Sequence, residues 1–74
     1  MQPYQNLGGN SGVRAYEIGE GSIIVEFERG GAYLYTDASS GATHIAEMQR
    51  LARSGEGLAT YINKHTHDTY EREL

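Results

Sequence analysis

The sequence predicts an α+β domain, a three-stranded antiparallel meander followed by two helices packed on one face of the sheet. The first half of the chain contains three short runs rich in β-branched and aromatic residues, divided by glycine-containing links, which is typical of hairpin-connected strands. From about residue 42 the apolar residues recur every three or four positions, as on amphipathic helices. This order of patterns places a small sheet before a helical layer.

The two ends of the chain differ in composition from the region between them. Residues 1–11 are rich in Gly, Asn and Gln and predict a flexible N-terminal arm, and residues 71–74 are expected to be a frayed C-terminal tail. Residues 12–70 then form a single domain. A domain of this size buries only about 60% of its unfolded surface, so its core is marginal. The chain has no cysteine, so disulfides cannot supplement that core, but oligomerisation can.

The three strands are expected in the runs VRAYEIG, SIIVEFE and GAYLYT. The link before the third strand decides which way Tyr33 and Tyr35 face. A three-residue loop, with Gly30 at positive φ, places both tyrosines beside the alternating apolar residues of the second strand. A two-residue Arg29–Gly30 turn is disfavoured because it needs a positive φ at Arg29. A two-residue turn at Gly30–Gly31 would reverse the orientation of both rings and stays open as an alternative.

With the three-residue loop, the two faces of the sheet carry different sets of side chains. The apolar side chains that the helices should cover are Tyr16, Ile18, Ile23, Val25, Phe27, Tyr33 and Tyr35. The opposite face, beside Glu26, carries the candidate interaction surface Val13, Ala15, Ile24 and Leu34. So many apolar side chains are unusual on a solvated face, and they indicate a contact surface. Alternatively, the arm folds over this face with Tyr4 and Leu7 as anchors.

Two helices are expected in the second half. The first places apolar residues on one face and ends near Arg53, with Gly55 as a natural stop; its apolar residues are Ile45, Met48, Leu51 and Ala52. The second follows the helical spacing of Leu58, Tyr61, Ile62 and His65. This spacing predicts a partly buried histidine at position 65.

Two short motifs have the residue types of a chemical site, but neither predicts one. The stretch TDASSGATH brings Asp37, Ser39, Ser40 and His44 near one another, but Asp, Ser and Thr before a helix are typical capping residues. No Gly-x-Ser-x-Gly motif accompanies them. In the stretch HTHD, two histidines two positions apart point in different directions on a helix and cannot share a metal ion. We therefore expect no catalytic residues, no metal and no cofactor.

Charge and hydropathy limit the partners that the chain can take. The six basic residues are outnumbered by ten acidic ones, for a net charge of -4, and they are scattered along the chain. Nucleic-acid binding is therefore not expected, although it is not excluded, because nucleic-acid binders usually concentrate basic residues on one face. No run approaches the roughly 20 apolar residues that cross a bilayer. We expect a cytoplasmic protein that makes no membrane contact.

The stretch IIVEFERGGAYLY, residues 23–35, resembles the KTSC domain, a small module found at the C-terminal end of some lysyl-tRNA synthetases. In that family a strand ending in Phe leads through a Gly turn to Tyr-x-Tyr, and a helix, a Ser-Gly segment and a second helix with an aromatic residue and Asn follow. The matching positions here are Val25, Phe27, Gly30, Tyr33, Tyr35, Ser54, Gly57, Tyr61 and Asn63. The resemblance covers residues 12–70 and implies the fold and an accessory role, without catalytic residues to transfer.

The resulting functional hypothesis is a small non-catalytic interaction module. It would associate with a second copy, as a homodimer, or dock on another protein, through the exposed sheet face or an edge strand. The alternative is an accessory RNA- or nucleotide-contacting module, suggested by the family name and by exposed aromatic and basic groups such as Tyr4, Arg50, Arg53 and Lys64. A small hydrolase ranks third.

Overall fold

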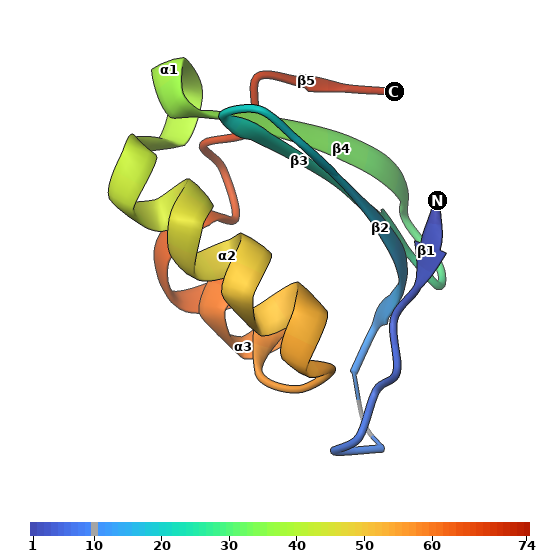
Figure 1. The fold of residues 1–74 in the computed structure, drawn as a ribbon. Coiled ribbons are helices and arrows are strands. Elements are labelled where there is room, and N and C mark those ends of the chain that lie inside the picture. Colours follow the sequence, from blue (N-terminus) through green and yellow to red (C-terminus); the bar gives the residue numbers. More distant parts are fainter. Residues whose placement is uncertain (10) are drawn as a thin grey trace.

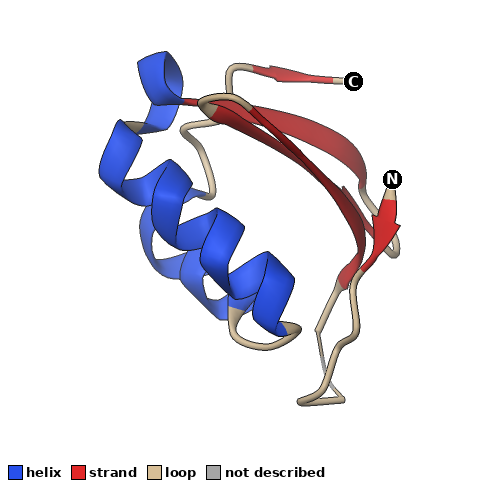
Figure 2. Ribbon diagram, in the orientation of Figure 1, coloured by secondary structure: helices blue, strands red, loops and turns tan. Residues whose placement is uncertain are grey.

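The structure is a computed structural model that describes residues 1–9 and 11–74. It has an antiparallel sheet of five strands in the order β1-β2-β3-β4-β5, with all the helices on one side of the sheet (Figures 1 and 2). The α+β class, with its central meander followed by helices, is therefore confirmed. The strands are β1 (Gln2–Pro3), β2 (Val13–Gly19), β3 (Ser22–Phe27), β4 (Gly31–Thr36) and β5 (Arg72–Glu73). The helices are α1 (Asp37–Ser40), α2 (Ala42–Ser54), α3 (Leu58–Tyr61) and the π-helix η1 (Ile62–Thr66).

The hairpin between β3 and β4 has the predicted three-residue loop. Phe27 pairs with Gly31, and the register continues so that Tyr33 lies opposite Val25. The positive φ of this loop falls on Gly31, at 81°, and not on Gly30 as expected. Both tyrosines of β4 thus face the helical layer, as predicted.

The core lies between this inner face and the helices. Ile23, Val25 and Tyr35 are buried on the sheet side, with Tyr35 only 2% exposed. From the helical side the buried residues are Ile45, Met48, Ala52, Leu58 and Ile62. Tyr33 packs against this cluster but stays partly exposed, so the two tyrosines share a face and differ in depth.

The first long helix, α2, ends where the sequence predicts. Gly55 adopts a left-handed φ of 80°, and its N–H donates to the carbonyls of Leu51 and Ala52, which satisfies two otherwise free groups of the last turn. The second expected helix is divided into α3 and η1. The wider turn of the π-helix brings Thr66, four residues after Ile62, into the buried position, where its hydroxyl donates to Met48 Sδ at 3.5 Å. His65 is exposed, so the prediction of a partly buried histidine is wrong.

Both terminal segments differ from their sequence predictions. In the expected arm, Gln2–Pro3 pairs with β2 and Tyr4 is buried in the core, where its hydroxyl accepts a hydrogen bond from the Leu58 N–H at 3.2 Å. In the expected tail, Arg72–Glu73 pairs with β4 as the fifth strand. The two ends thus extend the meander at both edges (Figure 1). The segment after β1 reaches the end of α2, where the Leu7 N–H donates to the Gly55 carbonyl at 2.7 Å.

Candidate functional site

The sheet surface turned away from the helices, here called the outer face, carries half of the predicted interaction surface. Ile24 lies directly opposite Leu34 in the register, and both side chains are partly exposed. Neither belongs to the core or to the residues packed against it. The helices leave this side of the sheet uncovered (Figure 2). Two of the four expected apolar residues therefore lie partly exposed on this face.

The other two predicted members of that surface are buried. The register between β2 and β3 shifts between Val13 and Ala15, so that Val13 pairs with Phe27 and turns into the core, where it is 2% exposed. The prediction that Val13 lies on the exposed face is wrong. A β-bulge adds one residue to β2, so the residues before the bulge point to the opposite face of the sheet from the one expected. Ala15 lies opposite Glu26 but is 8% exposed, so it offers almost no area to a partner.

Charged side chains stand at both ends of the row that contains Ile24 and Leu34. Glu17 pairs with Ile24 from the β2 side, and Arg72 pairs with Leu34 from the β5 side. Because directly opposed residues share a face, the row reads Glu17–Ile24–Leu34–Arg72 across four strands. We call it the outer row. The sequence did not indicate Arg72 because its strand lies in the segment expected to fray.

The inner face has an aromatic cluster at the end of the sheet where β3 turns into β4. The Phe27 and Tyr33 rings meet edge to face at 5.8 Å between centroids, and Tyr70 lies 4.7 Å from Tyr33 and 6.4 Å from Tyr35. Burial, together with the neighbouring Tyr33 and Tyr70, raises the pKa of Tyr35 to about 12. The Tyr35 phenol is therefore neutral near pH 7. Sequence reasoning missed Tyr70, which follows no helical or strand period.

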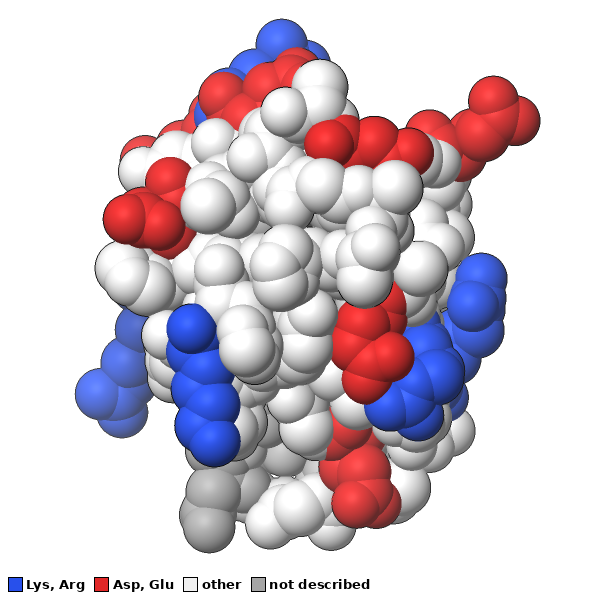
Figure 3. Space-filling view, turned by 90° about the vertical axis from the view of Figure 1, so that its left-hand side faces the viewer, with Lys and Arg blue, Asp and Glu red and all other residues white. Residues whose placement is uncertain are grey.

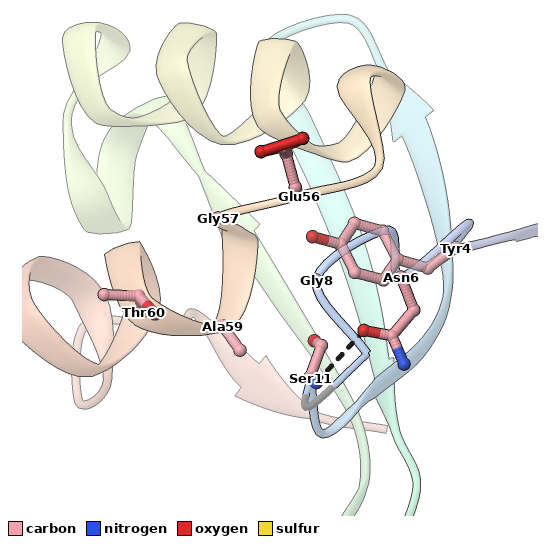
Figure 4. A pocket seen from close by; sticks show the side chains of 8 residues that line it. All are labelled: Tyr4, Asn6, Gly8, Ser11, Glu56, Gly57, Ala59 and Thr60. Carbon is pink, nitrogen blue, oxygen red and sulfur yellow. Dashed lines mark hydrogen bonds between the residues drawn. The ribbon is translucent and has the colours of Figure 1, made fainter.

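A small pocket of about 230 Å³ lies where the N-terminal segment meets the turn between α2 and α3. Figure 4 shows the Tyr4 ring pointing toward this turn and the Asn6 side chain accepting from the Ser11 N–H, at 3.0 Å. Gly57 lines the same pocket at a left-handed φ of 88°. These contacts hold the segment against the helices, and they indicate a structural junction.

The residues of the TDASSGATH stretch serve as caps and tethers. Thr36 is the N-cap of α1 and forms a capping box with Ser39, as the capping interpretation expects. The Ser40 hydroxyl reaches the Thr69 carbonyl at 2.9 Å and so ties α1 to the C-terminal segment. The imidazole of His44 turns away to Tyr61, whose hydroxyl lies 2.6 Å from Nδ1.

His44, Tyr61 and His65 form a partly exposed aromatic group on the helical surface. The two imidazoles stack with 5.5 Å between centroids, and the Tyr61 ring lies 4.5 Å from His65. Partial burial and the Glu47 carboxylate raise the pKa of Tyr61. In the described part of the chain, no group of three or more His, Cys, Asp or Glu side chains could hold a metal ion.

Charge on the helical side of the molecule is mixed. Figure 3 shows this side, where acidic and basic side chains are dispersed around an uncharged centre. Arg50, Arg53 and Lys64 are all exposed, and Arg50 is paired with Glu47 through a double hydrogen bond. This surface offers no concentrated basic track for a phosphate backbone. Across residues 1–9 and 11–74, no helix has the length and hydropathy to cross a membrane.

Comparisons of the chain with protein-family models, with curated proteins and with solved structures found no match. The resemblance to the KTSC domain stays a prediction that rests on the residues quoted for it.

Proposed function

We propose that this protein is a non-catalytic interaction module that forms a symmetric homodimer through its outer face. The observation that carries the proposal is the outer row, in which an acid, two apolar residues and a base follow one another across the sheet. Such a row is complementary to its own reversed copy. The cytoplasmic location expected from the sequence remains part of the proposal.

Charge selects one of the two ways in which a two-fold axis can relate stacked sheets. An axis parallel to the strands, between β3 and β4, reverses the row and sets Glu17 of one copy over Arg72 of the other. An axis along the row would set Glu17 over Glu17 and Arg72 over Arg72, which is repulsive. The first arrangement also stacks Ile24 on Leu34 of the second copy, as in an aligned sheet packing. The Glu17 side chain is 60% exposed, although the Met1 amino group lies 3.9 Å away, so it is accessible to a partner.

The edges of the sheet are less suited to association than its outer face. Both edge strands are only two residues long, and β1 contains Pro3, which has no N–H to donate to another strand. Short edge strands with proline or charged residues are a common protection against strand addition. This favours the outer face over the edge-strand docking that the sequence left open.

The size of the outer face predicts a weak dimer. The three central strands have six or seven residues and the two edge strands have two. With a strand spacing of about 4.8 Å and a rise of about 3.3 Å per residue, they cover roughly 350–400 Å². The resulting area of about 400 Å² per partner is half of the ~800 Å² found in stable interfaces. We therefore expect a dissociation constant in the micromolar range or weaker, and association that is visible only at high concentration.

Sedimentation velocity from about 5 to 500 μM tests the proposal. The protein should sediment as a monomer at the low end and increasingly as a dimer at the high end, whereas Leu34→Glu should stay monomeric. The matched control is Ala46→Glu, an exposed position on α2, which should dimerise like the parent.

A charge-exchange experiment tests the orientation of the two copies. Glu17→Arg and Arg72→Glu should each weaken self-association, because each homodimer would contain two like-charge contacts. Mixed together, the two variants should form a heterodimer in which both contacts are again complementary. A mixture that associates no better than either variant alone would refute the outer-row arrangement, and a parent that stays monomeric throughout would refute the dimer.

A further inference from the structure

The aromatic cluster on the inner face encloses a pocket that the proposed dimer does not use. It has a volume of about 290 Å³, and its walls include Phe27, Tyr33, Tyr35 and Tyr70, with Asn63 and His67 from the helical side. This volume is at the low end of the range for ligand pockets. The pocket therefore suits a small group, such as the terminal group of one side chain. It lies between the inner face of β3 and β4, the π-helix η1 and the segment that leads to β5.

The rings stand at steep angles to one another and thus form separate walls. Phe27 and Tyr33 are inclined by 72°, Tyr33 and Tyr70 by 59°, and Tyr35 and Tyr70 by 88°. Because all four rings line one pocket, they surround it from several directions. An aromatic face carries the negative end of the ring quadrupole, so each ring whose face borders the pocket attracts a positive charge.

The polar groups of the pocket agree with a positively charged occupant. None of its lining residues is Lys or Arg. Glu73 lies opposite Tyr33 in the register and so shares its face, while Arg72 points to the other side of the sheet. The Tyr35 residue is 2% exposed, yet it lines the pocket, and we find no hydrogen bond of its hydroxyl among the described residues. The lone pairs of this oxygen are therefore available to a cation.

We propose that this pocket binds a trimethylammonium group. The ring faces attract its charge, and its methyl groups need no hydrogen bonds, which aromatic walls do not supply. A bare ammonium would lose water-mediated hydrogen bonds there without replacement. The group can come from a free small molecule such as choline or from a trimethylated lysine side chain.

Titration of the ¹⁵N-labelled full chain with choline tests the chemistry. Choline should shift the amide resonances of Tyr33, Asn63 and Tyr70 in a saturable manner. The control ligand is 3,3-dimethylbutan-1-ol, which has the same shape but carries a neutral carbon in place of the charged nitrogen. It should bind at least about fivefold more weakly, since it lacks the attraction between cation and rings. Equal binding of both ligands, or no saturable shift with either at millimolar concentration, would overturn the proposal.

Substitutions at Tyr70 separate the role of the ring from that of the hydroxyl. Because Tyr70 is 38% exposed, its replacement leaves most of the core intact. Tyr70→Phe keeps the ring and should keep choline binding, whereas Tyr70→Leu keeps an apolar side chain and should weaken binding by at least about fivefold. Unchanged affinity in Tyr70→Leu, in a variant with the parent melting temperature, would contradict a site walled by this ring. Both variants should self-associate like the parent, because Tyr70 packs on the inner face.

Two further ligands distinguish the sources of the group. A short peptide with one trimethyllysine is compared with free choline, and the same peptide with unmodified lysine serves as its control. Tighter binding of the trimethylated peptide than of choline assigns the pocket to a modified protein, and tighter binding of choline assigns it to a small molecule. If the unmodified peptide binds as well as the trimethylated one, recognition of the methylated cation is refuted.

Discussion

Tyr4 provides the sharpest test of how the N-terminal segment contributes to stability. Tyr4 is only 6% exposed. Its hydroxyl accepts a hydrogen bond from the Leu58 N–H at the start of α3. Truncation of a buried aromatic ring to alanine costs about 3–5 kcal/mol. Removal of the hydroxyl alone leaves the Leu58 N–H without its acceptor and costs about 1–2 kcal/mol. A chain of this length has a total stability of roughly 4–11 kcal/mol, so the larger loss is a major part of it.

Urea denaturation followed by circular dichroism measures both losses. We expect Tyr4→Phe to lower the free energy of unfolding by about 1–2 kcal/mol. Each kcal/mol should lower the melting temperature by about 4–8 °C. Tyr4→Ala should lower it by about 4 kcal/mol. Leu7→Ala is the control within the same segment, because Leu7 is 63% exposed and its loss should change stability by less than about 0.5 kcal/mol. If Tyr4→Ala behaves like Leu7→Ala, the segment does not dock as described.

Three further predictions follow from the described packing. Tyr35→Ala should destabilise the protein by on the order of 4 kcal/mol and Tyr33→Ala by about half as much, as measured in the same denaturation assay, because only Tyr35 is fully buried. The pKa of Tyr35 is raised to about 12, so the unfolded chain loses this proton first. The stability that this group contributes should therefore be fully present below pH ~10 and be lost from there toward pH ~12. Tyr35→Phe should reduce that fall in a series of urea titrations, and an equal fall in parent and variant would contradict the assignment. Gly55→Ala should destabilise the protein more than Gly57→Ala, by about 1 kcal/mol or more, although both glycines have a left-handed φ. At Gly55 the new Cβ would lie 2.8 Å from Gln5 Cβ, whereas at Gly57 the nearest atom, Leu51 Cδ2, is 3.4 Å away. Equal losses of stability would show that Gln5 can move aside at no cost in free energy.

Local patterns in the sequence were sufficient to predict the central meander and the first long helix. Strand runs, glycine-containing links and the stop at Gly55 each carry their information within a few residues. The loop before β4 illustrates this: the steric cost of a positive φ at Arg29 correctly favoured three residues. The orientation of Tyr33 and Tyr35 followed from that one decision.

The failures share a physical cause, since each depends on a single inserted residue or on a contact far along the chain. The bulge before Ala15 has no glycine signature, and it moved Val13 from the outer face into the core. The π-helix η1 widened one turn and exchanged His65 for Thr66 at the buried position. Tyr4 and Tyr70 are single aromatic residues without a repeating neighbour, so no periodicity could place them. The candidate site was therefore half predictable, at Ile24 and Leu34, and Arg72 was missed with the strand that carries it.

Both terminal segments add a strand and a tyrosine ring to a marginal core, but the two rings are buried to different degrees. Each combines a two-residue edge strand with one tyrosine, Tyr4 after β1 and Tyr70 before β5, whose ring packs beneath the sheet. Tyr4 is 6% exposed and hydrogen-bonded to α3, so its end of the molecule is closed. Tyr70 is 38% exposed and leaves the aromatic pocket open beside it. A ring held by tertiary packing alone, just before a two-residue strand, can adjust to an occupant at small cost. For this reason we expect ligand recognition at the C-terminal end of the inner face, while the N-terminal end serves stability.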